Sequence, residues 1–109
     1  MDGKIEIKRH KVFKAWLKRL KKRDNVVHER IEKRLALIEE TGYLGDHRYI
    51  SDGVWELRDH YGAGYRVYFT RQNFEIIFLL CGGTKNGQER DIKSAKQLLK
   101  EKYDGYEQI

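Results

Sequence analysis

The chain opens with alternating charged and apolar residues and then changes to a helical spacing. Between Lys4 and Arg9, the apolar Ile5 and Ile7 lie on one side, which predicts a short half-buried strand. From Val12 onward, apolar residues recur at i, i+3, i+4 and i+7, which predicts an amphipathic helix whose other face is mostly Lys and Arg. The apolar stripe of this helix consists of Phe13, Trp16, Leu17 and Leu20.

A second helix is predicted to follow at once. Either Asp24 or Asn25 can cap its start, and Gly42 stands where a left-handed residue commonly ends a helix. Its apolar stripe consists of Val27, Ile31, Leu35 and Ile38. The two helices are therefore expected to form an antiparallel hairpin. A further amphipathic helix is predicted between Arg90 and Tyr103.

Glycines punctuate the region after Gly42, between short runs rich in Val, Tyr, Phe and Ile, which is typical of strands joined by tight turns. The predicted strands are Val54–His60, Tyr65–Arg71 and Phe74–Cys81. The last is the most apolar, so we expect it to lie centrally. Together these elements predict an α+β fold: an antiparallel, mixed-edge sheet of about four to five strands, two N-terminal helices packed on it, and a C-terminal helix.

The length of 109 residues fits one domain, which we place at residues 1–103, with 104–109 as a frayed C-terminal tail. A glycine-rich segment from Cys81 to Gly87 predicts a flexible loop that brings Lys85 near the strand ends. The segment lacks the residue order of a P-loop, so a purely structural role competes with a functional one.

Strand parity sorts the predicted sheet into two faces, because successive side chains point to opposite sides. The face expected to pack on the helices carries Trp55, Leu57, Val67 and Phe69. The opposite face, predicted to be exposed, carries Arg58, His60, Arg66 and Tyr68. Arginines can hold a phosphate while a base stacks on an aromatic ring. The alternative is an ordinary solvated face whose arginines pair with Glu56 and Asp59.

Charge favours a polyanionic partner. Lys and Arg number 23 against 17 Asp and Glu, so the net charge is +6, and nucleic acid is the first candidate. The basic first helix, Lys11 to Arg23, either contacts RNA or is a solvated face; Lys11, Lys14 and Lys18 are its candidate RNA-binding residues.

Metal and thiol chemistry find little support in the sequence. The four histidines are scattered without the paired spacings of zinc sites, so we expect no metal and no cofactor. Cys81 ends an apolar run and has no histidine at a defined spacing, which disfavours a cysteine nucleophile. A single cysteine, no signal-like N-terminus and no long apolar stretch predict a cytoplasmic protein that does not enter a membrane.

Two runs of sequence resemble the RelE/HigB superfamily of type II toxins, in the branch described as phage-derived Gp49-like or addiction-module killer proteins. They are WELRDHYGAGYRVYF from Trp55 to Phe69 and LLCGGTKNGQERDIKSAK from Leu79 to Lys96. The similarity extends to FKAWLKRL in the first helix and to the turn from Gly42 to Asp46. It implies a RelE-like fold, in agreement with the order of elements predicted above.

The resemblance also implies a function. Proteins of this kind are ribosome-dependent mRNA endoribonucleases that cleave mRNA in the A site without a metal and thereby inhibit translation. A cognate antitoxin, of the helix-turn-helix DNA-binding kind, neutralises them, and operator DNA is reached only through that antitoxin. The competing interpretation is a catalytically inactive binding module of the same fold that acts with a DNA-binding antitoxin.

Residue roles carry over by position within the matching motifs. Arg66 matches the arginine placed on the scissile phosphate, Arg58 matches a basic residue of the preceding strand, and Lys85 takes the place of a basic residue after the last strand. Tyr65 and Tyr68 are candidates for contact with RNA bases.

The sequence does not identify the residues that transfer protons. Glu56 stands where a lysine is often found, and Asp91 or Ile92 falls near the position of a C-terminal tyrosine. His60, Tyr68 and Asp91 are the remaining candidates, and an imidazole suits acid or base catalysis because it titrates near neutral pH.

Overall fold

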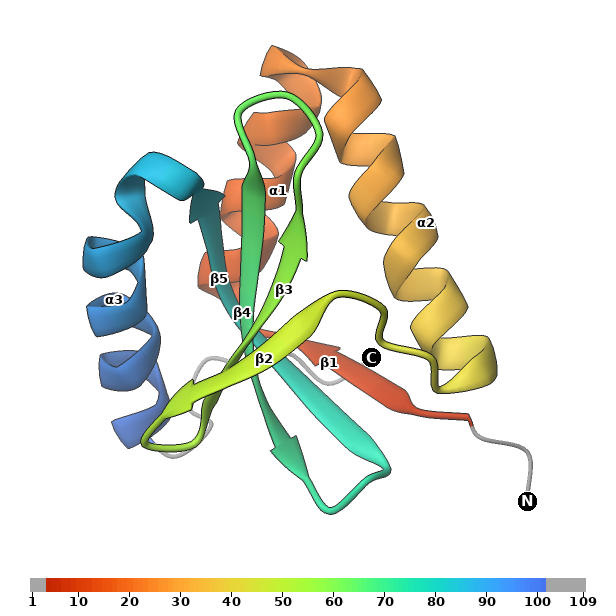
Figure 1. Cartoon of the computed structure of the whole chain (residues 1–109), viewed down its shortest axis with the longest axis vertical. Coiled ribbons are helices and arrows are strands. Elements are labelled where there is room, and N and C mark those ends of the chain that lie inside the picture. The colour runs from red at the N-terminus through yellow and green to blue at the C-terminus, as the bar shows by residue number, and fades with distance from the viewer. Residues whose placement is uncertain (1–3, 102–109) are drawn as a thin grey trace.

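The computed structural model describes residues 4–101, in which one five-stranded sheet carries helices on both faces (Figure 1). The strands are β1 Glu6–Arg9, β2 His47–Ser51, β3 Val54–Asp59, β4 Tyr65–Gln72 and β5 Ile76–Thr84. The helices are α1 Lys11–Arg23, α2 Asn25–Thr41, the 3-10 turn η1 Lys85–Gly87, and α3 Gln88–Lys100. The predicted α+β fold is confirmed. The predicted domain end at residue 103 and the tail 104–109 lie outside the described residues.

The strand order is β1-β5-β4-β3-β2. All neighbours are antiparallel except β1 and β5, which run parallel, so one edge is mixed as predicted. The central strand is β4, and the apolar β5 lies beside it, so the predicted central place of the last strand is wrong by one position. β2 was not predicted as a strand because its sequence HRYIS shows little apolar alternation, and as an edge strand it needs little.

The helix ends follow the sequence closely. Asp24 ends α1 and caps α2, because its Oδ1 accepts a hydrogen bond from the Val27 N–H at 3.2 Å. Gly42 ends α2 in the left-handed conformation, with φ of 77°. The last helix, α3, begins at Gln88, two residues before the predicted Arg90, and its predicted end at Tyr103 lies outside the described part of the chain.

Two apolar clusters lie on opposite faces of the sheet. The larger cluster joins α1 and α2 to the strands and includes Leu57, Val67 and Phe69, so the predicted helix-facing side is confirmed. The smaller cluster lies under α3 and includes Tyr68, Leu80, Cys81 and Ala95. In residues 4–101 there is no helix with the length and apolarity needed to cross a bilayer.

The two glycines after Cys81 belong to β5, so the flexible loop predicted there is wrong. A Cβ at Gly82 would lie 2.5 Å from the Trp16 ring, and a Cβ at Gly83 would lie 1.9 Å from Asp91 Oδ2. The glycines therefore let α1 and α3 approach opposite faces of one strand closely. Lys85 follows at the strand end, as predicted.

Candidate functional site

Arg58 on β3 and Arg66 on β4 are opposite each other in the antiparallel register, and Gly83 continues the row on β5. Residues paired in this way place their side chains on the same face, about 5 Å apart at Cβ. Arg66 is only 5% exposed, whereas about a third of the Arg58 side chain, 32%, is exposed. One cation of the pair is thus enclosed and its neighbour reaches solvent.

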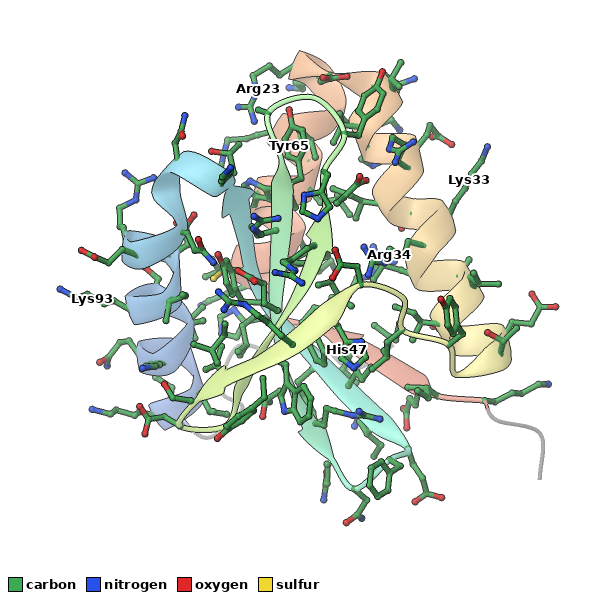
Figure 2. The ribbon with its side chains drawn as sticks, in the orientation of Figure 1. Arg23, Lys33, Arg34, His47, Tyr65 and Lys93 are labelled. Atoms are coloured by element: carbon green, nitrogen blue, oxygen red, sulfur yellow. The ribbon has the colours of Figure 1, made fainter. Side chains whose placement is uncertain are left out.

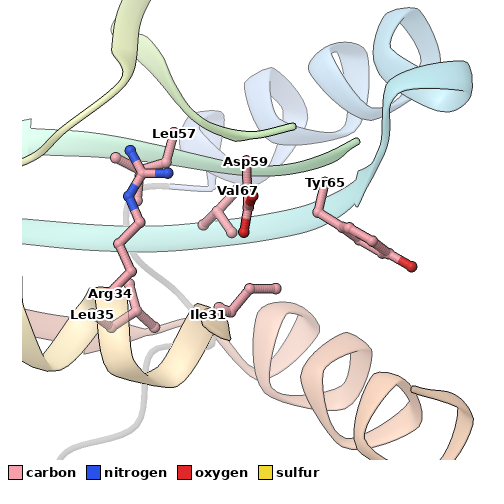
Figure 3. A pocket seen from close by; sticks show the side chains of 7 residues that line it. All are labelled: Ile31, Arg34, Leu35, Leu57, Asp59, Tyr65 and Val67. Carbon is pink, nitrogen blue, oxygen red and sulfur yellow. The ribbon is translucent and has the colours of Figure 1, made fainter. Parts of the chain in front are cut away.

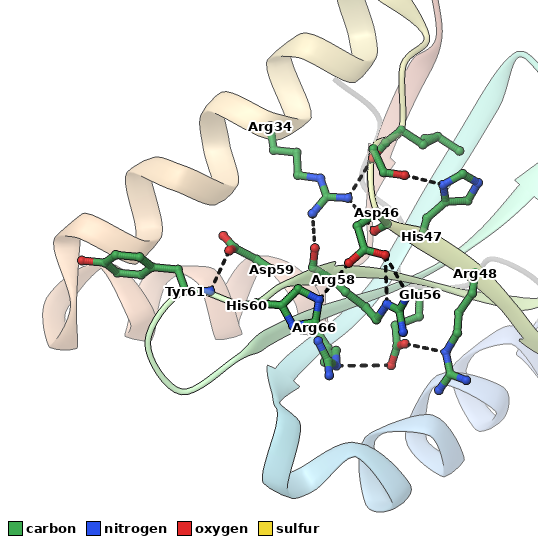
Figure 4. A network of polar contacts seen from close by, with 12 residues as sticks. Arg34, Asp46, His47, Arg48, Glu56, Arg58, Asp59, His60, Tyr61 and Arg66 are labelled. Atoms are coloured by element: carbon green, nitrogen blue, oxygen red, sulfur yellow. Dashed lines mark hydrogen bonds and ion pairs between the residues drawn. The ribbon is translucent and has the colours of Figure 1, made fainter.

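A fully buried carboxylate, Glu56, anchors the enclosed arginine (Figure 4). Its Oε1 accepts a hydrogen bond from Arg48 Nε at 2.9 Å, and its Oε2 accepts one from Gln88 Nε2 at 2.7 Å. Arg66 Nε lies 3.6 Å from the same Oε2. A buried charge is tolerated only when it is paired and hydrogen-bonded. Glu56 therefore links β2, β3, β4 and α3 through one side chain.

Arg66 keeps unused donors despite this pairing. Its Nε and Nη1 atoms are buried and make no hydrogen bond within residues 4–101. Buried donors are usually satisfied, so such groups call for a ligand that is not part of the chain. A guanidinium presents its N–H donors in a fork that matches phosphate oxygens. Arg66 is therefore suited to binding an anion next to Arg58.

The parity of the strands was predicted correctly, but the exposure of this face was not. α3 packs on it, so Tyr68 is fully buried and cannot stack on a base. Burial, with the nearby charge of Glu56 as a second cause, raises the pKa of Tyr68 far above its usual value. The predicted stacking of Tyr68 on a base is therefore not supported, because α3 covers the ring.

Tyr65 also lies in the interior, on the opposite face from Arg66. It lines a narrow pocket between α2 and the sheet and is buried (Figure 3). The other lining residues are Ile31, Arg34, Leu35, Leu57, Asp59 and Val67. The predicted RNA contact of Tyr65 is therefore not supported, because the hairpin turn before β4 directs this ring under α2.

A second polar cluster joins Arg58 to His60 through Asp46 (Figure 4). Arg58 Nε and Nη2 donate to Asp46 Oδ1 at 3.1 and 2.8 Å, and His60 Nε2 lies 2.9 Å from Asp46 Oδ2. The hydrogen bonds from Arg58 lower the pKa of Asp46, and the bond from His60 adds to this effect. Because an ionised carboxylate only accepts, His60 Nε2 carries the proton of this bond.

The position of Asp46 depends on Arg34 of α2, which lies between that helix and the sheet (Figure 2). Arg34 Nη1 donates to the Arg58 carbonyl, and Nη2 donates to the Leu44 and Asp46 carbonyls at 2.8 and 2.7 Å. Gly45 between them has φ of 73°, a conformation that favours glycine. Neither Asp46 nor Arg34 was predicted as a site residue, because their link joins segments distant in sequence.

Lys85 and Asp91 lie at the far end of the arginine row. The Lys85 N–H donates to the Gly64 carbonyl at 2.6 Å, which ties the end of β5 to the β3–β4 hairpin, and its side chain is exposed. Asp91 of α3 packs on Gly83, the partner of Arg66 in the register. Burial raises the pKa of Asp91. The structure thus groups Arg58, Arg66, His60 and Asp91 on one face, with Lys85 at its edge.

The lysines of α1 lie elsewhere. Lys11, Lys14 and Lys18 are exposed, on the helix that covers the face opposite Arg66. α1 has no acidic residue, so this surface is strongly basic. Any RNA contact made by these lysines is therefore separate from the arginine row. Within the described residues, no group of three or more His, Cys, Asp or Glu side chains is arranged to hold a metal ion.

Comparison with known proteins places these features in a family context. The family model described as phage derived protein Gp49-like (DUF891) matches residues 15–100, which include both polar clusters. An uncharacterized protein of Haemophilus influenzae is 43% identical over 99 residues, which cover 89% of this chain and 95% of that relative. No solved structure matches.

Proposed function

Because the chain belongs to the phage derived Gp49-like family, we propose that it is the toxin of a type II toxin-antitoxin system, of the RelE/HigB kind. In this proposal it is a metal-independent endoribonuclease that cleaves mRNA in the ribosomal A site and inhibits translation. The observation that carries the proposal is Arg66, an enclosed guanidinium with two unused donors beside a second arginine. That arrangement suits the phosphodiester of an RNA chain.

The proposed reaction is attack of a ribose 2′-hydroxyl on the adjacent phosphorus. The P–O5′ bond breaks, and the products are a 2′,3′-cyclic phosphate and a 5′-hydroxyl. A base takes the 2′ proton, an acid gives one to the leaving 5′ oxygen, and cations stabilise the charge that grows on the phosphate oxygens. Arg66 and Arg58 supply the cations, and Lys85 is a further cation at the edge of the site.

His60 is the proposed general base. Its Nε2–H bonds to Asp46 at 2.9 Å, so Nδ1 is free to accept the 2′ proton while the carboxylate fixes the ring. Its side chain is 71% exposed, which leaves room for RNA. Asp91 is the proposed general acid, because it packs on Gly83 at the end of the arginine row and burial raises its pKa.

A second candidate function is a binding module of the same fold that does not cleave. The observation in its favour is the 5% exposure of Arg66 and its ion pair with Glu56, since both restrict access of a phosphate. Arg58 and His60, whose side chains are 32% and 71% exposed, are the accessible members of this face.

Purified protein on programmed ribosomes separates the two candidates. We expect mRNA cut in the A site, and a rate at least a hundredfold lower for Arg66→Ala. Lys33→Ala is the matched control, because it removes an exposed cation of α2, outside both the arginine row and the basic surface of α1. If mRNA stays intact while the wild-type protein is bound to the ribosome, the nuclease proposal fails and the binding module remains.

The partners follow from the same proposal. The ribosome and its mRNA are the targets, in the cytoplasm, and Lys11, Lys14 and Lys18 are proposed to contact ribosomal RNA through their charge. A cognate antitoxin of the helix-turn-helix kind is proposed to neutralise the protein and to link it to operator DNA. A neighbouring gene for such an antitoxin that rescues growth upon co-expression supports this assignment, and failure of rescue contradicts it.

A further inference from the structure

A row of aromatic rings with one guanidinium lies on the face opposite Arg66. It reaches the β4–β5 hairpin, which extends beyond the helices at one end of the sheet (Figure 1). We call it the aromatic strip; its members are Tyr49, Trp55, Arg71 and Phe74. Tyr49 is 52% exposed and Phe74 is 81% exposed. A contiguous group of exposed aromatic side chains, unlike a single exposed ring, marks an interaction surface.

Contacts with neighbouring rings hold Trp55, one member of the strip, in place. Trp55 stacks on the buried Phe69, with ring centroids 6.2 Å apart and an interplanar angle of 23°. His47 stacks on Trp55 at 6.1 Å, and Tyr49 meets it edge-on at 5.1 Å. The ring of Trp55 is therefore fixed by three contacts before any ligand arrives.

Arg71 continues the row between two rings. Its Cζ lies 5.5 Å from the Trp55 centroid and 5.3 Å from the Phe74 centroid. Its Nε is buried without a hydrogen bond to residues 4–101, and no carboxylate of this part of the chain forms an ion pair with it. The strip therefore carries a positive charge without an acidic partner, flanked by flat π surfaces.

We propose that the aromatic strip is a stacking platform for bases of single-stranded RNA, a second RNA site that extends the function proposed above. Aromatic rings and guanidinium planes stack on any base, while the positive charge attracts the backbone. Arg71 lies between the rings of Trp55 and Phe74, which combines a cation with flat aromatic surfaces. This composition fits nucleobases better than the leucine-rich face of a partner helix.

The edge strand β2 connects the two sites. Arg48 and Tyr49 are neighbours on β2, so their side chains point to opposite faces. Arg48 bonds to Glu56 on the Arg66 side, and Tyr49 contacts Trp55 in the strip. An RNA strand bound at Arg66 can therefore pass around this edge and place further bases on the strip.

The test uses a fluorescent 2′-O-methyl adenylate 12-mer, which cannot be cleaved by 2′-hydroxyl attack. Phe74→Ala and Tyr49→Ala are each expected to weaken its binding about tenfold, because one base loses its stacking partner. Tyr43→Ala is the matched control: Tyr43 is 68% exposed but lies outside the strip, and its loss is expected to leave affinity unchanged. Binding is expected to change the tryptophan emission of the wild-type protein. Trp55→Phe is expected to lose this change, because the other tryptophan of the sequence, Trp16, is packed against Gly82 and is not a member of the strip.

The RNA-binding measurements and the ribosome assay distinguish failure of the aromatic strip as an RNA site from failure of the proposed nuclease function. If Phe74→Ala weakens binding but the wild-type protein does not cleave on ribosomes, the strip stands without the nuclease. If Phe74→Ala and Tyr49→Ala both bind the 12-mer as tightly as wild type, the strip is not an RNA site and the proposal is wrong.

Discussion

Arg66 Nε lies 3.6 Å from the buried Oε2 of Glu56, so the proposed phosphate-binding arginine is held by a carboxylate with no access to solvent. The counter-charge of Glu56 explains how a buried guanidinium is tolerated. At this distance the pair leaves donors of Arg66 without a hydrogen bond and so available to a ligand. It also couples the site to α3, because Gln88 donates to the same oxygen. Stability and function therefore depend on the same few side chains.

Replacing Glu56 is predicted to lower the free energy of unfolding. Glu56→Gln removes the counter-charge of Arg66 inside the fold, and breaking a buried pair in this way typically costs about 3 to 5 kcal/mol. Urea denaturation at neutral pH measures the free energy of unfolding. Asp52→Asn is the control: the Asp52 side chain is 73% exposed, so loss of its surface ion pair with Lys96 is expected to cost about 1 kcal/mol or less. Equal stability of Glu56→Gln and wild type would show that the pair does not hold Arg66.

Enlarging Gly82 is predicted to separate α1 from the sheet. The methyl group of Gly82→Ala would lie 2.5 Å from the Trp16 ring, so the helix must shift, at about 1 to 3 kcal/mol. Gly83→Ala meets only the carboxylate end of the Asp91 side chain, which can rotate away, so it is expected to destabilise less while displacing that carboxylate. Thermal unfolding of both variants gives the comparison. An unchanged melting temperature for Gly82→Ala contradicts the close packing.

The catalytic assignment predicts a rate loss without loss of folding. His60→Ala is expected to slow cleavage on ribosomes by about 10²- to 10⁴-fold, as for removal of a general base. Asp46→Asn is expected to give a comparable loss, because an amide at this position can donate to His60 Nε2 and so place the ring proton on Nδ1, the proposed base. Single-turnover cleavage and unfolding curves are measured together. A full cleavage rate for His60→Ala assigns the base to another residue.

Stability is predicted to fall in acid through Glu32. Two hydrogen bonds from Arg9 lower the pKa of Glu32 below its unfolded value of about 4.3. A carboxyl group with a depressed folded pKa contributes stability above its unfolded pKa, and the contribution is lost as pH falls through the folded value. Unfolding free energies measured from pH 7 down to pH 3 are expected to decline less for Glu32→Gln than for wild type. Glu40→Gln, an exposed carboxylate at the end of the same helix, serves as the control, and identical declines for all three proteins would falsify the role of Glu32.

The sequence by itself determined the local elements and the division of side chains between faces. Periodicity and caps depend on neighbours along the chain, so α1 and α2 followed from pattern alone, and the pattern narrowed the cap of α2 to Asp24 or Asn25. The parity of β3 and β4 placed Arg58 and Arg66 on one face for the same reason, and the family resemblance then attached a reaction to them.

Only the tertiary structure decided which face is covered. Burial depends on what packs on a side chain, and nothing in the alternation of β3 or β4 shows that α3 lies over Tyr68 and Arg66. Long-range hydrogen bonds could not be predicted for a related reason. Arg34 donates to the loop at Asp46 across the space between α2 and the sheet, and the spacing of residues in the sequence does not encode this contact. The chain therefore specified the two arginines, while the fold enclosed one of them and left the other open to solvent.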